Sequence, residues 1–358
     1  MKTFTHLLPI LFFTLASIPA AHAYPEFIKN GYANCVTCHN SPRGGGMLNA
    51  YGKGIGASES FLARELPEEK KPTLEHGFLG RGMFLVNNEV SVFPMQLDYL
   101  GTLNLIDSLR FETVLGLQPT RVVNLLDNKK WSDYFVFRKI LTNYRPAEGL
   151  EFSLGRDFAP VGIQLPDHTA YVKLRNRRNV TDFVTQLRAE YWGEKYQITP
   201  FLYLPSYLEA KTNQERGVGL RGEYLFNDTT SVGSSFLLGS TTSIDRQLYT
   251  LFARVSGEKF GVLSEFDLTN RKTASATFKQ YSYFVKPFYF PFSWLEAAFY
   301  FEGLLVDKPF FDRLTRMGPS AFFRLNKEFS FQADGRLEFS RTGSTYASFY
   351  IQAIVGLL

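Results

Sequence analysis

The chain has 358 residues, of which 20% are charged, and its formal net charge of +5 at pH 7 is mild and spread along the sequence. The lack of a clustered basic patch excludes a nucleic-acid-binding role. The 35 Phe and 19 Tyr residues exceed what a soluble protein ordinarily needs, whereas an outer-membrane β-barrel builds its lipid-facing surface and interfacial girdles from such residues.

Residues 1–23 have the features of a secretory signal peptide. A short basic start, Met1-Lys2, precedes an apolar core over residues 7–18 and an A-x-A cleavage site over residues 21–23. The apolar core is too short for a confident transmembrane helix. We therefore predict export to the periplasm or outer membrane of a Gram-negative-type cell.

Residues 24–76 are predicted to form a small Gly-rich module with one covalently attached haem c, ending in a polar linker. The hexapeptide Asn34-Cys35-Val36-Thr37-Cys38-His39 is a CxxCH haem-attachment motif. Cys35 and Cys38 are spaced to form thioethers with one porphyrin, and His39 is the expected proximal ligand of the haem iron. A disulfide, a redox CxxC or a metal half-site is the alternative, but none of them accounts for the adjacent histidine.

The sixth ligand of the iron has three candidates. Met47 is nearest in sequence, and a methionine ligand would raise the reduction potential. His76 lies where the module meets the next domain, and His168 lies in the longest loop. Each has a structural alternative: Met47 as packing against the porphyrin, His76 as a linker residue, and His168 as a solvated loop residue.

Residues 77–358 alternate between apolar and polar side chains with a period of two, which predicts strands with one apolar face and one charged face. About sixteen segments show the pattern, each roughly ten residues long as membrane strands require. Their centres are Gly82, Tyr99, Thr113, Val136, Phe152, Leu187, Thr199, Leu220, Ser235, Thr250, Ser264, Tyr281, Phe299, Ser320, Asp334 and Ile351. We predict an all-β fold, an antiparallel outer-membrane barrel of about 16 strands. A soluble β-sandwich or lipocalin-like barrel would show the same alternation of apolar and polar residues, with its apolar face inside.

The connections between these segments alternate in length up to about Gly239. Short ones at 106–107, 145–149, 193–195 and 227–229 are separated by long ones at 119–130, 157–181 and 205–215. This parity is typical of periplasmic turns and external loops, and it puts the N-terminal module on the periplasmic side or in the lumen. One inner connection, Pro287 to Ser293, is longer than this scheme expects.

The longest loop, Pro160 to Asn179, carries a basic run from Lys173 to Arg178. Folded inward it would narrow the pore, and folded outward it would be a solvated external loop. Inward-facing charges are predicted to line the lumen, where carboxylates either attract cations such as Fe(II) or pair internally. These charges are Arg110, Glu112, Arg188, Glu190, Glu223, Glu265, Asp267, Glu296, Glu302, Asp334 and Glu338.

The N-terminal residues resemble the fused monohaem cytochrome–porins of the outer membrane, known chiefly from iron-oxidising bacteria. The matching residues are Pro25, Phe27, Lys29, Gly31, Cys35, Cys38, His39, Leu48, Asn49 and Gly52. Gly31 stands one position early, and the segment between His39 and Leu48 is longer by a couple of residues. The resemblance implies a barrel of about sixteen strands and electron transfer across the outer membrane, while these departures leave the electron donor open.

We therefore expect a haem-plugged or haem-capped outer-membrane barrel that transfers electrons. Its partners would be an external donor or acceptor, with Fe(II) as one candidate, and a periplasmic c-type cytochrome or other electron carrier. The alternative is a solute porin whose haem-bearing module is a plug or sensor. A third class is an enzyme, such as a haem peroxidase or an extracellular iron oxidase with an open coordination position.

Overall fold

The structure is a computed structural model, and it describes residues 38–39, 48–62, 73–87, 89–117, 135–165, 169–176, 178, 182–205, 214–307, 312–326 and 328–357. The predicted signal peptide, Cys35, Met47 and His168 lie outside the described residues. Within the described part of the chain, no helix is both long enough and apolar enough to cross a membrane.

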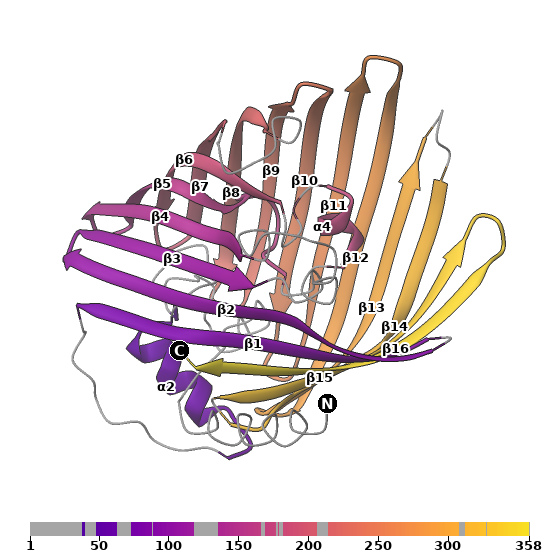
Figure 1. Ribbon diagram of the computed structural model, residues 1–358, viewed down its shortest axis with the longest axis horizontal. Helices are drawn as coiled ribbons and strands as arrows, with labels where there is room; N and C mark the ends of the chain where they lie inside the picture. Colours follow the sequence, from indigo (N-terminus) through magenta and orange to yellow (C-terminus); the bar gives the residue numbers. More distant parts are fainter. Residues whose placement is uncertain are drawn as a thin grey trace, which may run out of the picture.

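The strands form one closed barrel in which each strand pairs antiparallel with its sequence neighbours and β1 pairs with β16 (Figure 1). The first eight are β1 (Leu74–Val86), β2 (Val90–Ile106), β3 (Leu109–Leu117), β4 (Phe135–Ala147), β5 (Leu150–Phe158), β6 (Phe183–Trp192), β7 (Tyr196–Leu204) and β8 (Arg216–Asn227). The others are β9 (Thr230–Ser240), β10 (Ile244–Ser256), β11 (Phe260–Thr273), β12 (Thr277–Phe292), β13 (Leu295–Val306), β14 (Asp312–Arg324), β15 (Phe329–Ser340) and β16 (Thr345–Leu357). Each predicted strand centre falls inside its strand.

The alternation along each strand separates an apolar outside from a polar inside. In β7, Tyr196, Ile198 and Leu202 are exposed, while Gln197 and Thr199 between them are buried. The inward row across the barrel includes many buried charged residues, which a water-soluble barrel would put outside. The prediction of a sixteen-stranded barrel with its apolar face outward is confirmed, and the soluble-barrel alternative is wrong.

The predicted long connection from Pro287 to Ser293 is wrong. Strand β12 continues to Phe292, and its turn to β13 contains only Ser293 and Trp294. Proline lacks an N–H group but accepts an extended backbone, so it interrupts a hydrogen-bonded ladder without ending the strand. Pairing with β13 accordingly skips Pro287, while Pro287 still lies opposite Val262 of β11.

Helix α2 (Ala50–Ser58) lies at the end of the barrel where the short turns gather. Just after it, the Phe61 and Leu62 N–H groups donate to the carbonyl oxygens of Arg324 and Leu325 at 2.9 and 2.8 Å. The Phe61 ring meets Trp294 edge-on, with ring centroids 5.1 Å apart. Residues 61 and 62 thus join the barrel at its short-turn end.

Candidate functional site: a loop folded into the barrel

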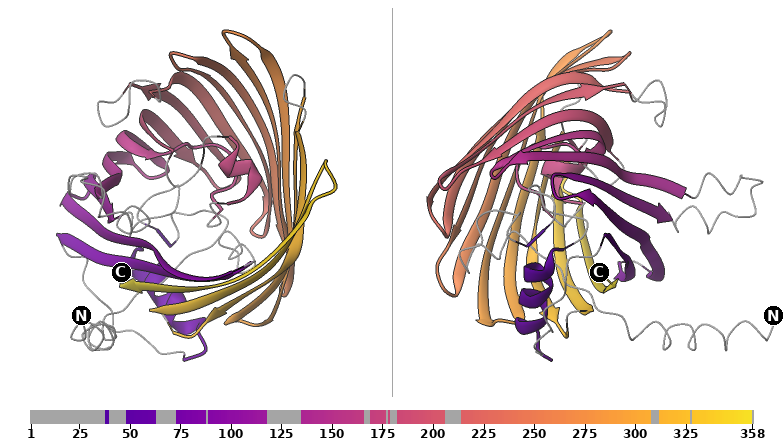
Figure 2. Two further views of the ribbon diagram at one scale, coloured as in Figure 1. Left: turned by 45° about the vertical axis from the view of Figure 1, so that its right-hand side comes forward. Right: turned by 90° about the vertical axis from the view of Figure 1, so that its left-hand side faces the viewer.

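The connection between β5 and β6 enters the barrel instead of projecting from it. It includes a short helix, α4 (Tyr171–Leu174), which Figure 2 shows within the ring of strands. Val161, Ala170 and Val172 are each 0% exposed, and α4 contacts β11, β12 and β13. The described part of this connection, residues 159–165, 169–176 and 178, is called the inner loop below.

An apolar sector of the barrel wall receives the inner loop. Ala159 and Val161 cluster with inward-facing Phe201, Leu237 and Leu248. A second cluster joins loop residues to strands β10 to β13, and its members are Ile163, Leu165, Ala170, Val172, Phe252, Leu263, Phe284, Phe288, Phe290 and Tyr300. Apolar side chains on the inner face of a polar lumen are stable only when covered, and the inner loop covers them. Apolar residues at inward positions of these strands are the sequence signal that predicts an inward direction for this loop.

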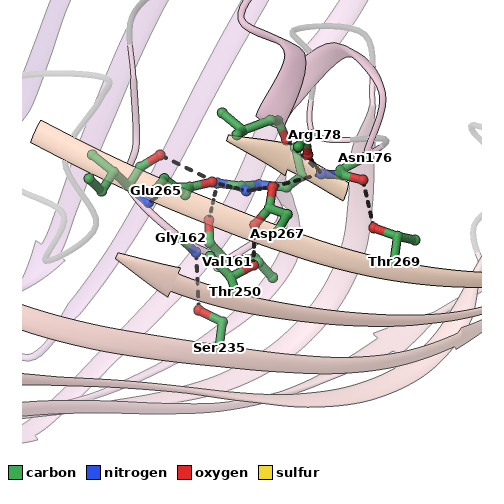
Figure 3. A network of polar contacts seen from close by, with 12 residues as sticks. Val161, Gly162, Asn176, Arg178, Ser235, Thr250, Glu265, Asp267 and Thr269 are labelled. Carbon is green, nitrogen blue, oxygen red and sulfur yellow. Dashed lines mark hydrogen bonds and ion pairs between the residues drawn. The ribbon is translucent and has the colours of Figure 1, made fainter. Parts of the chain in front are cut away.

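Arg178 is the central polar anchor of the inner loop (Figure 3). Its guanidinium donates to the Glu265 carboxylate and to the Val161 carbonyl oxygen, and lies 3.4 Å from Asp267. The Ile163 N–H donates to Glu265 at 2.5 Å. These groups are buried, so each charge is stabilised only by its partner. The loop therefore has one defined position on the wall, called its seat below.

Asn176 is a second anchor on the same wall. Its side-chain amide donates to Asp267 at 2.6 Å and to the Ser282 hydroxyl at 3.0 Å. Its side-chain oxygen accepts from Thr269 at 2.7 Å and from Gln280 at 2.8 Å. A fully bonded buried amide of this kind specifies one orientation of the chain.

Tyr171 ties the helical part of the loop to the next wall sector. Its N–H donates to Glu302 at 2.9 Å and its hydroxyl to Glu338 at 2.5 Å. Burial and this hydrogen bond to Glu338 raise the pKa of the Tyr171 phenol, which therefore stays a donor. Arg316 completes the junction, since it bonds both Glu302 and the Thr169 carbonyl oxygen at 2.8 Å.

Gly162 makes the sharp bend that brings the loop onto the wall. Its φ of 61° lies in the left-handed region, and its N–H donates to the Ser235 hydroxyl at 3.1 Å. A Cβ atom there would overlap Glu265 and Arg178. Only glycine meets both the conformational and the steric demand.

A cavity of about 260 Å³ lies beside the loop, between Thr169 and the wall formed by β1, β2 and β14 to β16. Arg81, Arg336, Met95 and Tyr350 are among its lining residues. Arg336 bonds the Thr169 and Tyr350 hydroxyls, whereas the Nε of Arg81 is buried without a hydrogen-bond partner among the described residues. The lumen beside the loop is thus polar and cationic in places.

The other predicted lumen charges are mostly paired with one another. Arg110 bonds Glu112 and Glu151, Lys139 lies 2.6 Å from Glu112, and Arg188 lies 2.9 Å from Asp157. Elsewhere the pairs are Arg221 and Arg254 with Glu223, Lys286 with Glu296, and Arg336 with Asp334. Of the two roles predicted for the lumen carboxylates, internal pairing is therefore the one that the structure shows. Four other predicted carboxylates hold the inner loop, namely Glu265, Asp267, Glu302 and Glu338.

The described part of the CxxCH motif, Cys38 and His39, forms one compact unit with residues 48–52. His39 forms an antiparallel bridge with Leu48, and both are buried. The Asn49 N–H donates to the Cys38 carbonyl oxygen at 3.0 Å, and the Asn49 side chain caps α2 through the Gly52 N–H. A Cβ at Gly52 would overlap that same carbonyl. Leu48, Asn49 and Gly52 therefore position Cys38 and His39.

The remaining predicted haem residues divide as follows. Cys38 is buried, and its expected partner Cys35 lies outside the described residues. Among the candidates for the sixth ligand, Met47 and His168 also lie outside the described residues. His76 is an exposed residue of β1, on the outward face with Leu74 and Phe78, and its ring lies 6.4 Å from that of Tyr99. The structure thus does not bring His76 to the module interior.

No protein-family model and no curated protein matches the chain. Solved structures of outer-membrane proteins do match its fold. A loop-deletion mutant of OmpT from Vibrio cholerae superposes with a TM-score of 0.65 at 10% identity, over 79% of this chain and 99% of that one. An anion-selective porin from Comamonas acidovorans gives 0.58 at 13% identity (79% and 98%), and OmpF from Salmonella typhi gives 0.60 at 13% (79% and 97%). The chain has the porin fold, which supports an outer-membrane location.

Proposed function

We propose that the protein is an outer-membrane pore for small hydrophilic solutes, with a haem-bearing module at its periplasmic mouth. The observation that carries the pore is the inner loop, seated on one side of the lumen by Arg178, Asn176 and Tyr171. A loop that narrows a polar lumen sets the size and charge of what passes. The similarity in fold to porins supports the same function.

Planar-bilayer conductance tests the pore. The purified full-length protein should give stable stepwise currents, and replacing residues 160–178 by a short Gly-Ser linker should enlarge the steps by about twofold or more. The matched control shortens the connection 241–243, which joins β9 and β10 at the same end. Currents that are absent from the full-length protein, or steps that are the same size without the loop, would show that the barrel is not a solute pore.

A second function, electron transfer, is favoured by the unit that Leu48, Asn49 and Gly52 build around Cys38 and His39. These residues fit a c-type haem: Cys38 with Cys35 would hold it, and His39 would bind the iron. A haem so held supplies a one-electron redox centre. Residues 61 and 62 bond the short-turn end of the barrel. In this proposal that end is periplasmic, so a periplasmic c-type cytochrome or another carrier would exchange electrons there. An external redox substrate would reach the centre through the pore.

Two measurements test this second function. A reduced-minus-oxidised absorption spectrum of the membrane fraction should show a c-type haem, and Cys38→Ala should remove it. In liposomes with an internal reductant and an external acceptor, the haem-loaded protein should pass electrons faster than Cys38→Ala at equal protein density. Equal rates would exclude electron transfer while leaving the solute pore intact.

A further inference from the structure

The outward face of the barrel carries a cationic edge at its external end. Cross-strand pairing sets Arg216 of β8 beside Ser240, Ser240 beside Asp245, and Asp245 beside Lys272 of β11. These four side chains are exposed, and they alternate along their strands with inward residues such as Glu215 and Arg246. They therefore face away from the lumen, at the end opposite the short turns.

The next rows toward the middle of the barrel change from polar to apolar. Gln247, Asn270 and Lys279 form the second row, again by direct cross-strand pairing. In the third row Tyr249 pairs with Leu268, and Leu268 with Tyr281. Tyrosine is enriched where a membrane protein passes from hydrocarbon to headgroups. Lys272 and Lys279 thus stand at headgroup level, directly above the aromatic girdle.

The first two rows border an open groove of about 720 Å³. Arg216, Lys272 and Lys279 line it, together with Asp245 and Asp307. Asp245 accepts a hydrogen bond from Ser240 at 2.7 Å, and neither lysine is ion-paired among the described residues. Further along the same edge, Arg313 and Arg341 are exposed neighbours on β14 and after β15.

The geometry within the groove suits more than one anionic group. Lys279 is opposite Asn270, so it is a diagonal neighbour of Lys272 on the adjacent strand, near enough for both ammonium groups to reach one phosphate. Arg216 lies three strands from Lys272, about 14 Å away at the usual strand spacing. Two separated phosphates on one headgroup would therefore be matched at once.

The opposite rim has the reverse charge. Five consecutive short turns each carry an exposed acid, namely Asp107, Glu148, Glu194, Asp228 and Glu258. The only exposed cations in these five turns are Lys195 and Lys259. An anionic headgroup is therefore attracted to the external edge and repelled at the periplasmic edge.

We infer that the groove at Arg216, Lys272 and Lys279 binds a phosphorylated saccharide lipid of the external leaflet. The acyl chains would lie along the third row and the phosphates at the two lysines and the arginine. This site faces lipid, so it is separate from the pore and from the haem module. It does not rest on either proposed function.

Native mass spectrometry of the detergent-solubilised full-length protein tests the inference, with bis-phosphorylated lipid A as the probe. The double variant Lys272→Gln with Lys279→Gln should bind it roughly thirtyfold more weakly, or about 2 kcal/mol, because each lysine near anionic lipid contributes about 1 kcal/mol. The matched control is Lys195→Gln with Lys259→Gln on the opposite rim, which should bind within twofold of the unaltered protein. Heat-modifiable gel mobility verifies that each variant folds.

Two further arms identify the ligand. Dephosphorylated lipid A, which keeps the acyl chains, should bind the unaltered protein as weakly as bis-phosphorylated lipid A binds the double variant. Inorganic phosphate in excess should displace little lipid, because it lacks the chains and bridges only one part of the groove. Equal binding of both lipids, or equal weakening by the opposite-rim control, would overturn the inference.

Discussion

Arg178 gathers two carboxylates that would otherwise face each other inside the barrel. Arg178→Ala leaves Glu265 and Asp267 buried without their cation, a change that costs about 3–5 kcal/mol in comparable pairs. We expect the inner loop to leave its seat, which limited proteolysis in the loop and noisier bilayer currents would detect. The control is Arg145→Ala, which breaks an ion pair with Glu151 that does not touch the loop. It should change neither the protease sensitivity of the loop nor the bilayer currents.

A second variant separates lost charge balance from lost packing. Combining Arg178→Ala with Glu265→Gln removes one of the two stranded carboxylates, so the loop should recover part of its protease resistance. If the double variant is as sensitive as the single one, the anchor acts through shape and not through charge. Arg178 lies in a basic run of the sequence, and Glu265 was predicted on the lumen wall. Because 87 residues separate them, no local pattern predicts that they meet.

Strands were easier to predict than the elements between them. Alternation is a local property of about ten residues, so β1 to β16 could be read directly from the chain. The one wrong prediction about the strands has a local cause as well, because Pro287 and Pro291 lie in the segment that was predicted as a connection. Helix α2 was not predicted, and the three glycines in Ala50–Ser58 are unfavourable for a helix. Asn49, a strong N-cap residue, was the available sign of that helix.

The attachment of α2 to the barrel gives a prediction for this element. Phe61→Ala removes ring contacts with Trp294 and Phe323, at centroid distances of 5.1 and 5.8 Å, and should loosen the module by about 1 kcal/mol. Hydrogen exchange of α2 should rise several-fold while barrel strands stay protected. Leu62→Ala is the control, because it keeps the neighbouring backbone hydrogen bond and removes a side chain of similar exposure, 55% against 52% for Phe61, that has no aromatic ring. Equal exchange in both variants would show that the aromatic contact does not hold the module.

At the scale of the whole molecule, the barrel closes on itself, and residues 61 and 62, just after α2, bond one end of it. Closure depends on the pairing of β1 with β16, and β1 begins only at Leu74. Nothing in this pairing involves residues 48–62, which contact the barrel at the turns beside Trp294 and Arg324 and through Lys53, 4.0 Å from Glu75 of β1. The division into a module over residues 24–76 and a barrel stays a prediction. The contact of Phe61 with the barrel end could not be predicted, because Phe61 and Arg324 are brought together only when the barrel has closed.

Deleting residues 24–72 after the signal peptide should therefore leave a folded barrel. We expect heat-modifiable gel mobility and stepwise bilayer currents like those of the full-length protein, because every strand pair and the seat of the inner loop are retained. All c-type haem absorbance should be lost, since Cys35, Cys38 and His39 lie in the deleted part. A Cys35→Ala, Cys38→Ala variant of the full chain should lose the same absorbance but keep the module. Haem bound to the truncated barrel, or a truncated chain that does not fold, would show that the two parts are interdependent.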